Sequence, residues 1–377
     1  MKLTQNRLVR LACLFIAATP QVMLASRQSC PPDSLDIKIG QIIMVGINER
    51  TMIEPNDPLL KDIQSGKTGG IILFEKNLAK ENTAATLKRL IGDMQQRSNI
   101  PLFISIDEEG GKVHRLKEKY GFVGMPSAAY LGALDNTDST LFYNRRLAAE
   151  LADLGINFNY APTLDLAINP DNTVIVKRER SFSIKPEIVA KHALICIKGH
   201  HEYGVKTILK HFPGHGSSTA DSHLGIVDVT KTWDFKELFP YYTILQSGQC
   251  DAIMTAHLIN HNWDESDLPG TLSNKVVNGM LRGLLGFQGV VFSDDMQMYA
   301  ISKNYGFEKA IELAINAGVD LLVFGNNVSK EVKAVTPSDI HRVIRSLVLD
   351  GKISMERINL AYLRIARLKA KSVKMGN

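Results

Sequence analysis

The 377-residue sequence lacks the compositional extremes that mark several classes of protein. Its residues are 45% hydrophobic and 22% charged, close to the average for soluble globular proteins. This balance excludes low-complexity disorder, a collagen-like repeat and a polytopic membrane protein. No long linker rich in proline, glycine or serine divides the chain, so one large domain is expected although the length would allow two.

Cysteine is scarce, and the four cysteines form no Cys-x-x-Cys pair. They stand at Cys13, Cys30, Cys196 and Cys250. A framework of several disulfides is therefore not expected, and the three cysteines after residue 26 leave room for at most one bridge.

Positive charge is in only slight excess. Lys and Arg number 44 against 39 for Asp and Glu, which gives a net charge of +5. Lys2, Arg7 and Arg10 lie in an N-terminal segment without acids, and without those three charges the balance is +2. No run of Lys and Arg and no basic patch interleaved with aromatics occurs, so a nucleic-acid partner is not expected.

The N-terminal segment has the order of features typical of an export signal. Basic residues in Met1–Arg10 precede a short apolar stretch, and small residues follow at Ala25 and Ser26. The stretch is shorter than the roughly 20 apolar residues of a membrane span, so stable insertion is not expected, with an uncleaved anchor as the alternative. We predict a signal peptide over residues 1–26, a domain over residues 35–377, and a periplasmic or extracellular location.

Beyond residue 35, short apolar runs alternate with amphipathic segments. The runs are rich in Ile, Val and Leu without polar alternation, as expected of parallel strands covered on both faces. The predicted strands are 39–47, 70–74, 101–107, 157–165, 207–211, 251–257, 289–294 and 320–324. Apolar residues at every third or fourth position predict helices between them. These helices are 81–97, 139–154, 186–203, 308–317, 340–349 and 353–373.

Eight strand-then-helix units predict an α/β fold, a (β/α)8 TIM-type barrel that forms a single catalytic domain. An open, doubly wound sheet is the alternative that this pattern leaves. In a barrel, reactive side chains lie where strands end and the following loops begin. Polar residues occupy such positions at 107–111, Asp165, 210–216, His257 and 293–295.

The segment 209–223 carries the most informative of these patterns. Lys210 and His211 end a predicted strand, a loop rich in glycine and serine follows, and Asp221 precedes His223 by two residues. A carboxylate at that spacing can accept the ring N–H of the histidine and raise its basicity. His223 is therefore a candidate proton donor and acceptor, and a hydrogen bond at the surface is the simpler interpretation of the same spacing.

Two other strand ends carry carboxylates. One run ends in Asp294 and Asp295, of which Asp294 is predicted to be reactive while Asp295 suits a helix cap, unless both are caps. The other run ends at Asp107 and continues through two glutamates and two glycines to Arg115, which suits the binding of sugar hydroxyls. The patterns of phosphate-binding loops are absent.

Histidines also raise the question of a metal site. The candidate ligands are His211, His215, His223 and His257, but the sequence contains neither His-x-Glu-x-x-His nor His-x-His. No metal is expected.

These motifs resemble glycoside hydrolase family 3, in particular its bacterial β-N-acetylglucosaminidase (β-N-acetylhexosaminidase) branch. The resemblance covers nearly the whole chain from about Leu35, and five motifs match in order and spacing. They are Asp107-x-Glu-Gly-Gly-x-Val-x-Arg115, Asn159-Tyr-Ala-Pro-Thr-Leu-Asp165, Glu179-Arg-Ser-Phe182, Lys210-His-Phe-Pro-Gly-His-Gly followed by Asp221-Ser-His223, and Ser293-Asp-Asp-Met-Gln-Met298.

The resemblance implies a retaining, exo-acting hydrolase of terminal, non-reducing β-linked N-acetylglucosamine in peptidoglycan fragments or chitooligosaccharides. It implies that Asp294 is the nucleophile and that His223, paired with Asp221, is the acid/base. Contacts with the sugar are implied for Asp107, Arg115, Arg180, Lys210 and His211. Neither a metal nor an organic cofactor is implied.

One segment departs from the usual pattern of that branch. The residues before Arg180, Val174-Ile-Val-Lys-Arg-Glu, are longer and more basic than usual, so either Arg178 or Arg180 reaches the sugar. A β-glucosidase of the same family and a non-catalytic carbohydrate-binding barrel are the alternative functions. The sequence indicates neither the aglycone, nor the preferred chain length, nor the oligomeric state.

Overall fold

The computed structural model describes residues 34–219, 225–327 and 333–373. The predicted signal peptide, residues 1–26, lies outside these ranges, and so do Asp221 and His223. Among the helices of the described ranges, none combines the length and the apolar character that a membrane crossing requires.

Eight parallel strands of the described chain close into a barrel, which confirms the predicted fold and excludes the open sheet. Each strand pairs with the next in the order β1, β2, β3, β4, β5, β7, β9 and β10, and β10 pairs with β1. Their bounds are β1 Ile43–Gly46, β2 Gly70–Leu73, β3 Phe103–Ile106, β4 Phe158–Asn159, β5 Lys206–Phe212, β7 Ala252–Thr255, β9 Val290–Asp295 and β10 Leu321–Phe324. A separate pair, β6 (Val227–Asp228) and β8 (Leu258–Ile259), lies outside the barrel.

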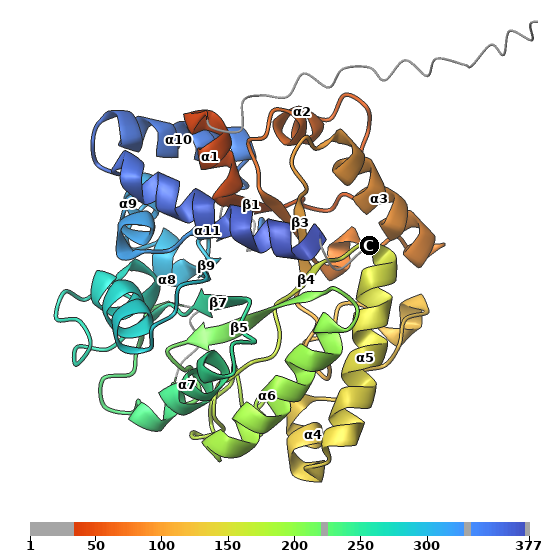
Figure 1. The fold of residues 1–377 in the computed structure, drawn as a ribbon, viewed down its shortest axis with the longest axis vertical. Helices are drawn as coiled ribbons and strands as arrows, with labels where there is room; N and C mark the ends of the chain where they lie inside the picture. Colours follow the sequence, from red (N-terminus) through yellow and green to blue (C-terminus); the bar gives the residue numbers. More distant parts are fainter. Residues whose placement is uncertain (1–33, 220–224, 328–332, 374–377) are drawn as a thin grey trace, which may run out of the picture.

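Helices surround the strands (Figure 1). They are α1 Leu35–Gln41, α2 Pro58–Gln64, α3 Thr83–Arg97, α4 Ala128–Leu134, α5 Thr137–Leu154, α6 Pro186–His201, α7 Phe239–Gln246, α8 Tyr299–Ser302, α9 Phe307–Ala317, α10 Pro337–Leu349 and α11 Met355–Val373. A π-helix spans Lys275–Leu284, and 3-10 turns span Glu75–Asn77, Glu118–Tyr120, Phe235–Leu238 and Gly270–Leu272.

Local signals account for where these elements begin and end. Asn136 caps α5 by accepting the N–H of Ser139, and Gly155 ends that helix in the left-handed conformation that glycine adopts without strain. All eight predicted strands and six predicted helices are present, with shifted ends. The prediction is wrong over residues 39–41, which belong to α1, because a buried helix and a buried strand are equally apolar.

The barrel interior is a packed core. The rings of Phe158, Tyr160 and Phe292 meet at its centre, with 6.2 Å between the centroids of Phe292 and each of the other two. All three side chains are buried, and each contributes roughly 1.5–3 kcal/mol through the removal of apolar surface from water. The barrel is therefore filled by side chains, and ligands must bind at its end.

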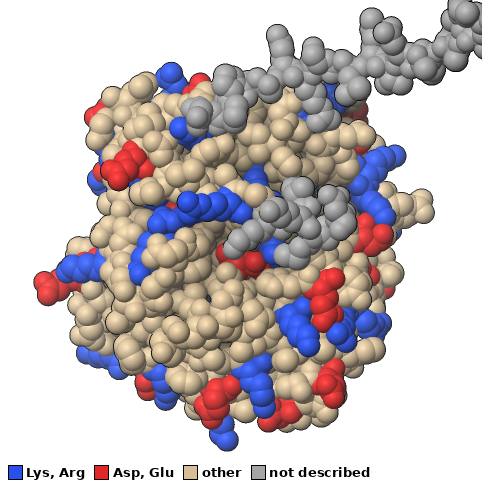
Figure 2. All heavy atoms as spheres, in the orientation of Figure 1, with Lys and Arg blue, Asp and Glu red and all other residues tan. Residues whose placement is uncertain are grey.

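Helix α11 packs against α1 and against the barrel. Its residues Arg357 and Arg364 and the π-helix residue Arg282 all bind the buried carboxylate of Asp320, which directly precedes β10. This cluster stabilises the end of the barrel at which the strands begin. On the face seen in Figure 2, Lys and Arg are interspersed with Asp and Glu among many uncharged residues.

Candidate active site

The polar strand ends meet in one cleft at the carboxyl-terminal end of the barrel. Asp107 follows β3, Lys210 and His211 lie in β5, and Asp294 and Asp295 end β9. Because the strands are parallel, their carboxyl ends meet at the same rim. The cleft is lined by Asp107, Arg115, Tyr160, Val174, Arg178, Arg180, Lys210, His211, His215, Asp294 and Asp295, among others.

The structure therefore brings together six of the predicted site residues. These are Asp107, Arg115, Arg180, Lys210, His211 and Asp294. The predicted acid/base His223 and its partner Asp221 lie outside the described residues.

Lys210 is the central cation of the cleft. Its Nζ contacts Asp107 and lies 2.6 Å from the Oε1 atom of Glu109. Burial alone would raise the pKa of both carboxyl groups. Lys210 and Arg115 nevertheless hold the pKa of Asp107 below its usual value, and Arg180 and Lys210 lower that of Glu109 to about 2. The buried lysine is thus compensated by two ionised carboxylates.

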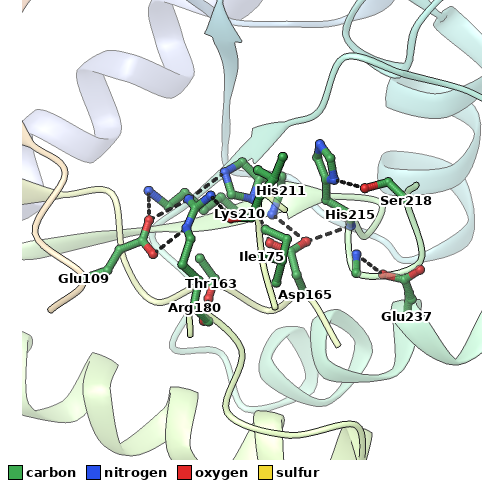
Figure 3. A network of polar contacts seen from close by, with 12 residues as sticks. Glu109, Thr163, Asp165, Ile175, Arg180, Lys210, His211, His215, Ser218 and Glu237 are labelled. Atoms are coloured by element: carbon green, nitrogen blue, oxygen red, sulfur yellow. Dashed lines mark hydrogen bonds and ion pairs between the residues drawn. The ribbon is translucent and has the colours of Figure 1, made fainter. Parts of the chain in front are cut away.

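Glu109 also holds Arg180 in a bidentate ion pair, with Nε–Oε2 and Nη2–Oε1 distances of 2.8 and 2.7 Å. Figure 3 shows the Glu109 carboxylate joined by dashed lines to the side chains of both Lys210 and Arg180. The sequence motif contains Glu109, the third acid of the run that follows β3, but the sequence analysis assigned it no role. Its spacing in that run is the signal that could have identified it.

His211 is fixed from both sides of its ring. Arg180 Nη2 donates to His211 Nε2 at 3.2 Å, and His211 Nδ1 lies 2.7 Å from Asp165 Oδ2. Because a guanidinium can only donate, Nε2 must be the acceptor and Nδ1 carries the proton toward Asp165.

Asp165 lies beneath the cleft. Its Oδ1 also accepts the backbone N–H of His215 at 2.8 Å. Burial opposes ionisation of Asp165, but the interaction with His211 lowers its pKa to about 2. Asp165 therefore orients the histidine from a fully buried position.

Glu108 ties together the two ends of the loop that carries Asp107 and Arg115. Its Oε2 accepts the backbone N–H groups of Arg115 and Leu116 at 3.0 and 2.9 Å. Its own backbone is held by the Asn159 side chain, which accepts from its N–H at 3.0 Å and donates to its C=O at 2.8 Å. This arrangement places the Arg115 guanidinium 3.6 Å from Asp107.

The two carboxylates at the end of β9 have different environments. Asp295 Oδ1 accepts the backbone N–H groups of Gln297 and Gly325, each at 3.0 Å, so this residue anchors the turn after the strand. The prediction that it caps the next helix is wrong, because Met298 occupies the N-cap position of α8. Asp294 Oδ1 accepts the backbone N–H of Asp295 at 2.7 Å.

The segment 172–180 settles which arginine lies deep in the cleft. The Arg180 side chain is 9% exposed and is held by Glu109 and His211, with Nη1 donating to the Val174 carbonyl at 3.2 Å. Arg178 also lines the cleft, but it is exposed to solvent.

Within the described ranges, no three His, Cys, Asp or Glu side chains are placed to hold a metal ion. His257, one of the candidate ligands, binds the Asp295 carbonyl through Nε2 at 3.0 Å and the Thr271 hydroxyl through Nδ1 at 2.9 Å. The position of His223 is not described.

Glu237 supports the turn that follows β5, and sequence reasoning did not identify it. Its Oε2 accepts the Gly216 N–H at 2.9 Å, and a Cβ atom at Gly214 would lie 2.5 Å from the Glu237 Cβ. Burial raises the pKa of Glu237 to about 8. Glu237 therefore holds the turn at Gly214 and Gly216 in place.

The arrangement suits a neutral ligand that carries many hydroxyl groups. Lys210, Arg180 and Arg115 donate, Asp107 accepts, and these charges largely compensate one another. A strand-end carboxylate, Asp294, borders the same cleft and can act as a nucleophile or a base.

The comparisons with known proteins agree with this chemistry. Residues 34–368 match the family model described as "Glycosyl hydrolase family 3 N terminal domain". A protein of Tolumonas auensis named "Beta-hexosaminidase" is 38% identical over 264 residues, which are 69% of this chain and 76% of that protein. "Beta-hexosaminidase A" of Pseudoalteromonas piscicida is 32% identical over 323 residues, 80% of this chain.

A solved structure is similar as well. A glycoside hydrolase family 3 β-N-acetylglucosaminidase from Paenibacillus sp. str. FPU-7 superposes with a TM-score of 0.82 at 35% identity, over 91% of this chain and 64% of the other. The chain also spans only 53% of the Pseudoalteromonas protein, so some relatives are considerably longer.

Replacement of Glu237 by Gln should change how stability depends on pH. Glutamine keeps an acceptor for Gly216 but cannot ionise. A carboxyl group whose pKa is higher in the folded than in the unfolded state lowers the stability of the protein as the pH rises between the two pKa values. Here these values are about 4.3 and about 8. As the pH rises through this range, the free energy of unfolding of the wild type should therefore decrease relative to that of Glu237→Gln. The relative decrease should reach on the order of a few kcal/mol at pH 8.

The measurement is the melting temperature of both proteins from pH 5 to pH 9. The exposed Glu265→Gln provides a variant with the same chemical change and no buried carboxyl. Parallel curves for wild type and Glu237→Gln would contradict the raised pKa.

Proposed function

The chain belongs to glycosyl hydrolase family 3, and we propose that its cleft hydrolyses terminal, non-reducing β-linked N-acetylglucosamine. The observation that carries the proposal is the single cleft in which Asp294 stands beside Asp107, Lys210 and Arg180. Relatives named as β-hexosaminidases and a similar β-N-acetylglucosaminidase structure support the choice of sugar.

In the proposed complex, the described residues bind and orient the sugar. Asp107 accepts hydrogen bonds from ring hydroxyls, while Lys210, Arg115 and Arg180 donate to hydroxyl and carbonyl oxygens. The ring of His211 lies beside these groups, and its contacts with Asp165 and Arg180 fix its orientation. Because these groups are already paired, they need little reorganisation when the sugar enters.

The reaction that we propose has two displacement steps. The Asp294 carboxylate attacks the anomeric carbon, the bond to the aglycone oxygen breaks, and His223 protonates the departing oxygen. His223 then removes a proton from water, whose oxygen displaces Asp294 and regenerates the free enzyme. Two inversions give overall retention, so the first product is the β-anomer. Asp221 is proposed to orient His223 and to favour its charged form.

Asp294→Asn should lose at least about 10⁴-fold in kcat on an aryl β-N-acetylglucosaminide, because the amide keeps the shape but is a poor nucleophile. Asp295→Asn is the matched control. Its amide oxygen can still accept the N–H groups of Gln297 and Gly325, so we expect a loss of less than about tenfold.

Mass spectrometry of the enzyme treated with a 2-fluoro sugar bearing a good leaving group should locate a covalent adduct on Asp294. Early formation of the α-anomer without any adduct would make Asp294 a base that activates water. If Asp295→Asn were inactive while Asp294→Asn kept its activity, the nucleophile would instead be Asp295.

His223→Ala should slow the hydrolysis of disaccharides far more than that of nitrophenyl glycosides, by an additional factor of about 10²–10⁴. A basic leaving oxygen needs a proton in the transition state, whereas nitrophenolate leaves without one. The kcat values for the two substrate classes measure this difference. Equal slowing would indicate that His223 binds substrate and does not transfer a proton.

We also propose that the enzyme acts outside the cytoplasm, on peptidoglycan fragments or chitooligosaccharides, because residues 1–26 have the features of a signal peptide. Intact-mass analysis of the protein from a Gram-negative host should find a chain that starts near Ala25 or Ser26. A full-length mass in the cytosolic fraction would contradict export, and a full-length mass in the membrane fraction would indicate an uncleaved anchor.

A further inference from the structure

His114 lies in the loop that carries Asp107 and Arg115, directly before Arg115. It occupies a position that the motif Asp107-x-Glu-Gly-Gly-x-Val-x-Arg115 leaves open, so the family resemblance implies no role for it. The residue is 6% exposed and is not among those that line the cleft. Any influence of His114 on a bound sugar must therefore pass through another residue.

The residue that His114 contacts is Glu108, which is fully buried. The Nδ1 atom of His114 contacts Glu108 Oε1. Glu108 Oε2 accepts the backbone N–H groups of Arg115 and Leu116, at 3.0 and 2.9 Å. One carboxylate oxygen thus faces the histidine while the other holds the backbone of the sugar-binding loop. Among the ion pairs formed within residues 34–219, 225–327 and 333–373, only the one with His114 includes Glu108.

The surroundings of His114 favour its charged form. Burial alone would lower the pKa of the ring, but the hydrogen bond with Glu108 raises it, and the carboxylates of Glu118 and Glu150 act in the same direction. Glu150 belongs to α5 and accepts the Val123 N–H at 3.1 Å. A charged imidazolium donates from Nδ1, so His114 both binds the Glu108 carboxylate and compensates it inside the protein.

The orientation of Glu108 decides where the backbone at Arg115 lies. Its Oε2 atom can accept two N–H groups of the loop only while the carboxylate keeps one rotation, and the contact of Oε1 with His114 fixes that rotation. A buried donor that loses its acceptor costs free energy, so a misplaced carboxylate would force the loop to move. The Arg115 guanidinium, now 3.6 Å from Asp107, would move with it.

We propose that His114 is a positioning residue of the sugar-binding site, which through Glu108 fixes the backbone at Arg115 and so aims the Arg115 guanidinium at the sugar. This inference rests on the proposed hydrolase function and adds a residue to its binding machinery. Arg115 would hold the sugar equally in the ground state and in the transition state. Loss of His114 should therefore raise KM and leave kcat nearly unchanged.

His114→Leu removes the Nδ1 donor and keeps much of the volume. On an aryl β-N-acetylglucosaminide its KM should rise about tenfold, while kcat stays within about threefold of the wild type. His114→Asn should bring KM back to within about threefold of the wild type, because its amide nitrogen can donate from the place of Nδ1. His114→Gln, whose longer side chain carries the amide toward the place of Nε2, takes the part of His114→Leu if the leucine protein does not fold.

His341→Leu is the matched control. His341 is also 6% exposed, and its Nε2 atom binds the Asp36 carbonyl at 3.0 Å, away from the residues that line the cleft. This variant should keep the KM of the wild type. An unchanged KM in the folded His114 variant, or a fall in kcat without a rise in KM, would overturn the proposal.

Coupling to Arg115 tests whether His114 acts through that residue. Arg115→Gln should raise KM by itself, and the further change His114→Leu should add little, since both remove the same contact with the sugar. If the two increases in KM multiplied, His114 would act independently of Arg115 and the proposal would be wrong.

Hydrogen exchange measures the same link without a substrate. In His114→Leu, the amides of Arg115 and Leu116 should exchange at least about tenfold faster than in the wild type, because their acceptor is no longer held. Mass spectrometry of peptides that cover the loop gives these rates, and equal rates in the two proteins would overturn the inference. If these amides respond but the wild type fails to cleave the aryl glycoside, the proposed hydrolase function is at fault instead.

Discussion

The ionised carboxylate of Glu109 is the group on which the polar side of the cleft depends. It binds both Lys210 and Arg180, and Arg180 in turn fixes the hydrogen-bonding state of His211. Removal of one member of such a buried set leaves uncompensated charge, which typically costs about 3–5 kcal/mol. The network therefore acts as one unit, and its members are ordered before any ligand arrives.

The barrel supplies the geometry that this network requires. Asp107 and Asp294 are far apart in sequence, yet the closed sheet places both at its carboxyl-terminal rim. Side chains below the rim then fix the loops, as Asn159 does for Glu108 and as Asp165 does for His211. The Asp294 carboxylate comes from strand β9, which gives it a rigid position relative to Asp107 and Lys210.

Charge in the cleft changes from its floor to its rim. At the floor, acidic and basic side chains compensate each other, which suits a neutral sugar. At the rim, Arg178 adds a positive charge that no carboxylate of the described residues pairs with. A site built in this way can hold a neutral sugar at its floor by shape and hydrogen bonds.

The sequence by itself determined the barrel, because eight buried apolar runs alternate with amphipathic helices, and it determined which strand ends carry polar residues. Its motifs also identified four candidate site residues, Asp107, Lys210, His211 and Asp294. Only the tertiary structure decided the roles of the supporting residues. Whether Glu109 binds Arg180 and whether Asp295 anchors a turn depend on contacts between residues distant in the chain, which local patterns do not encode.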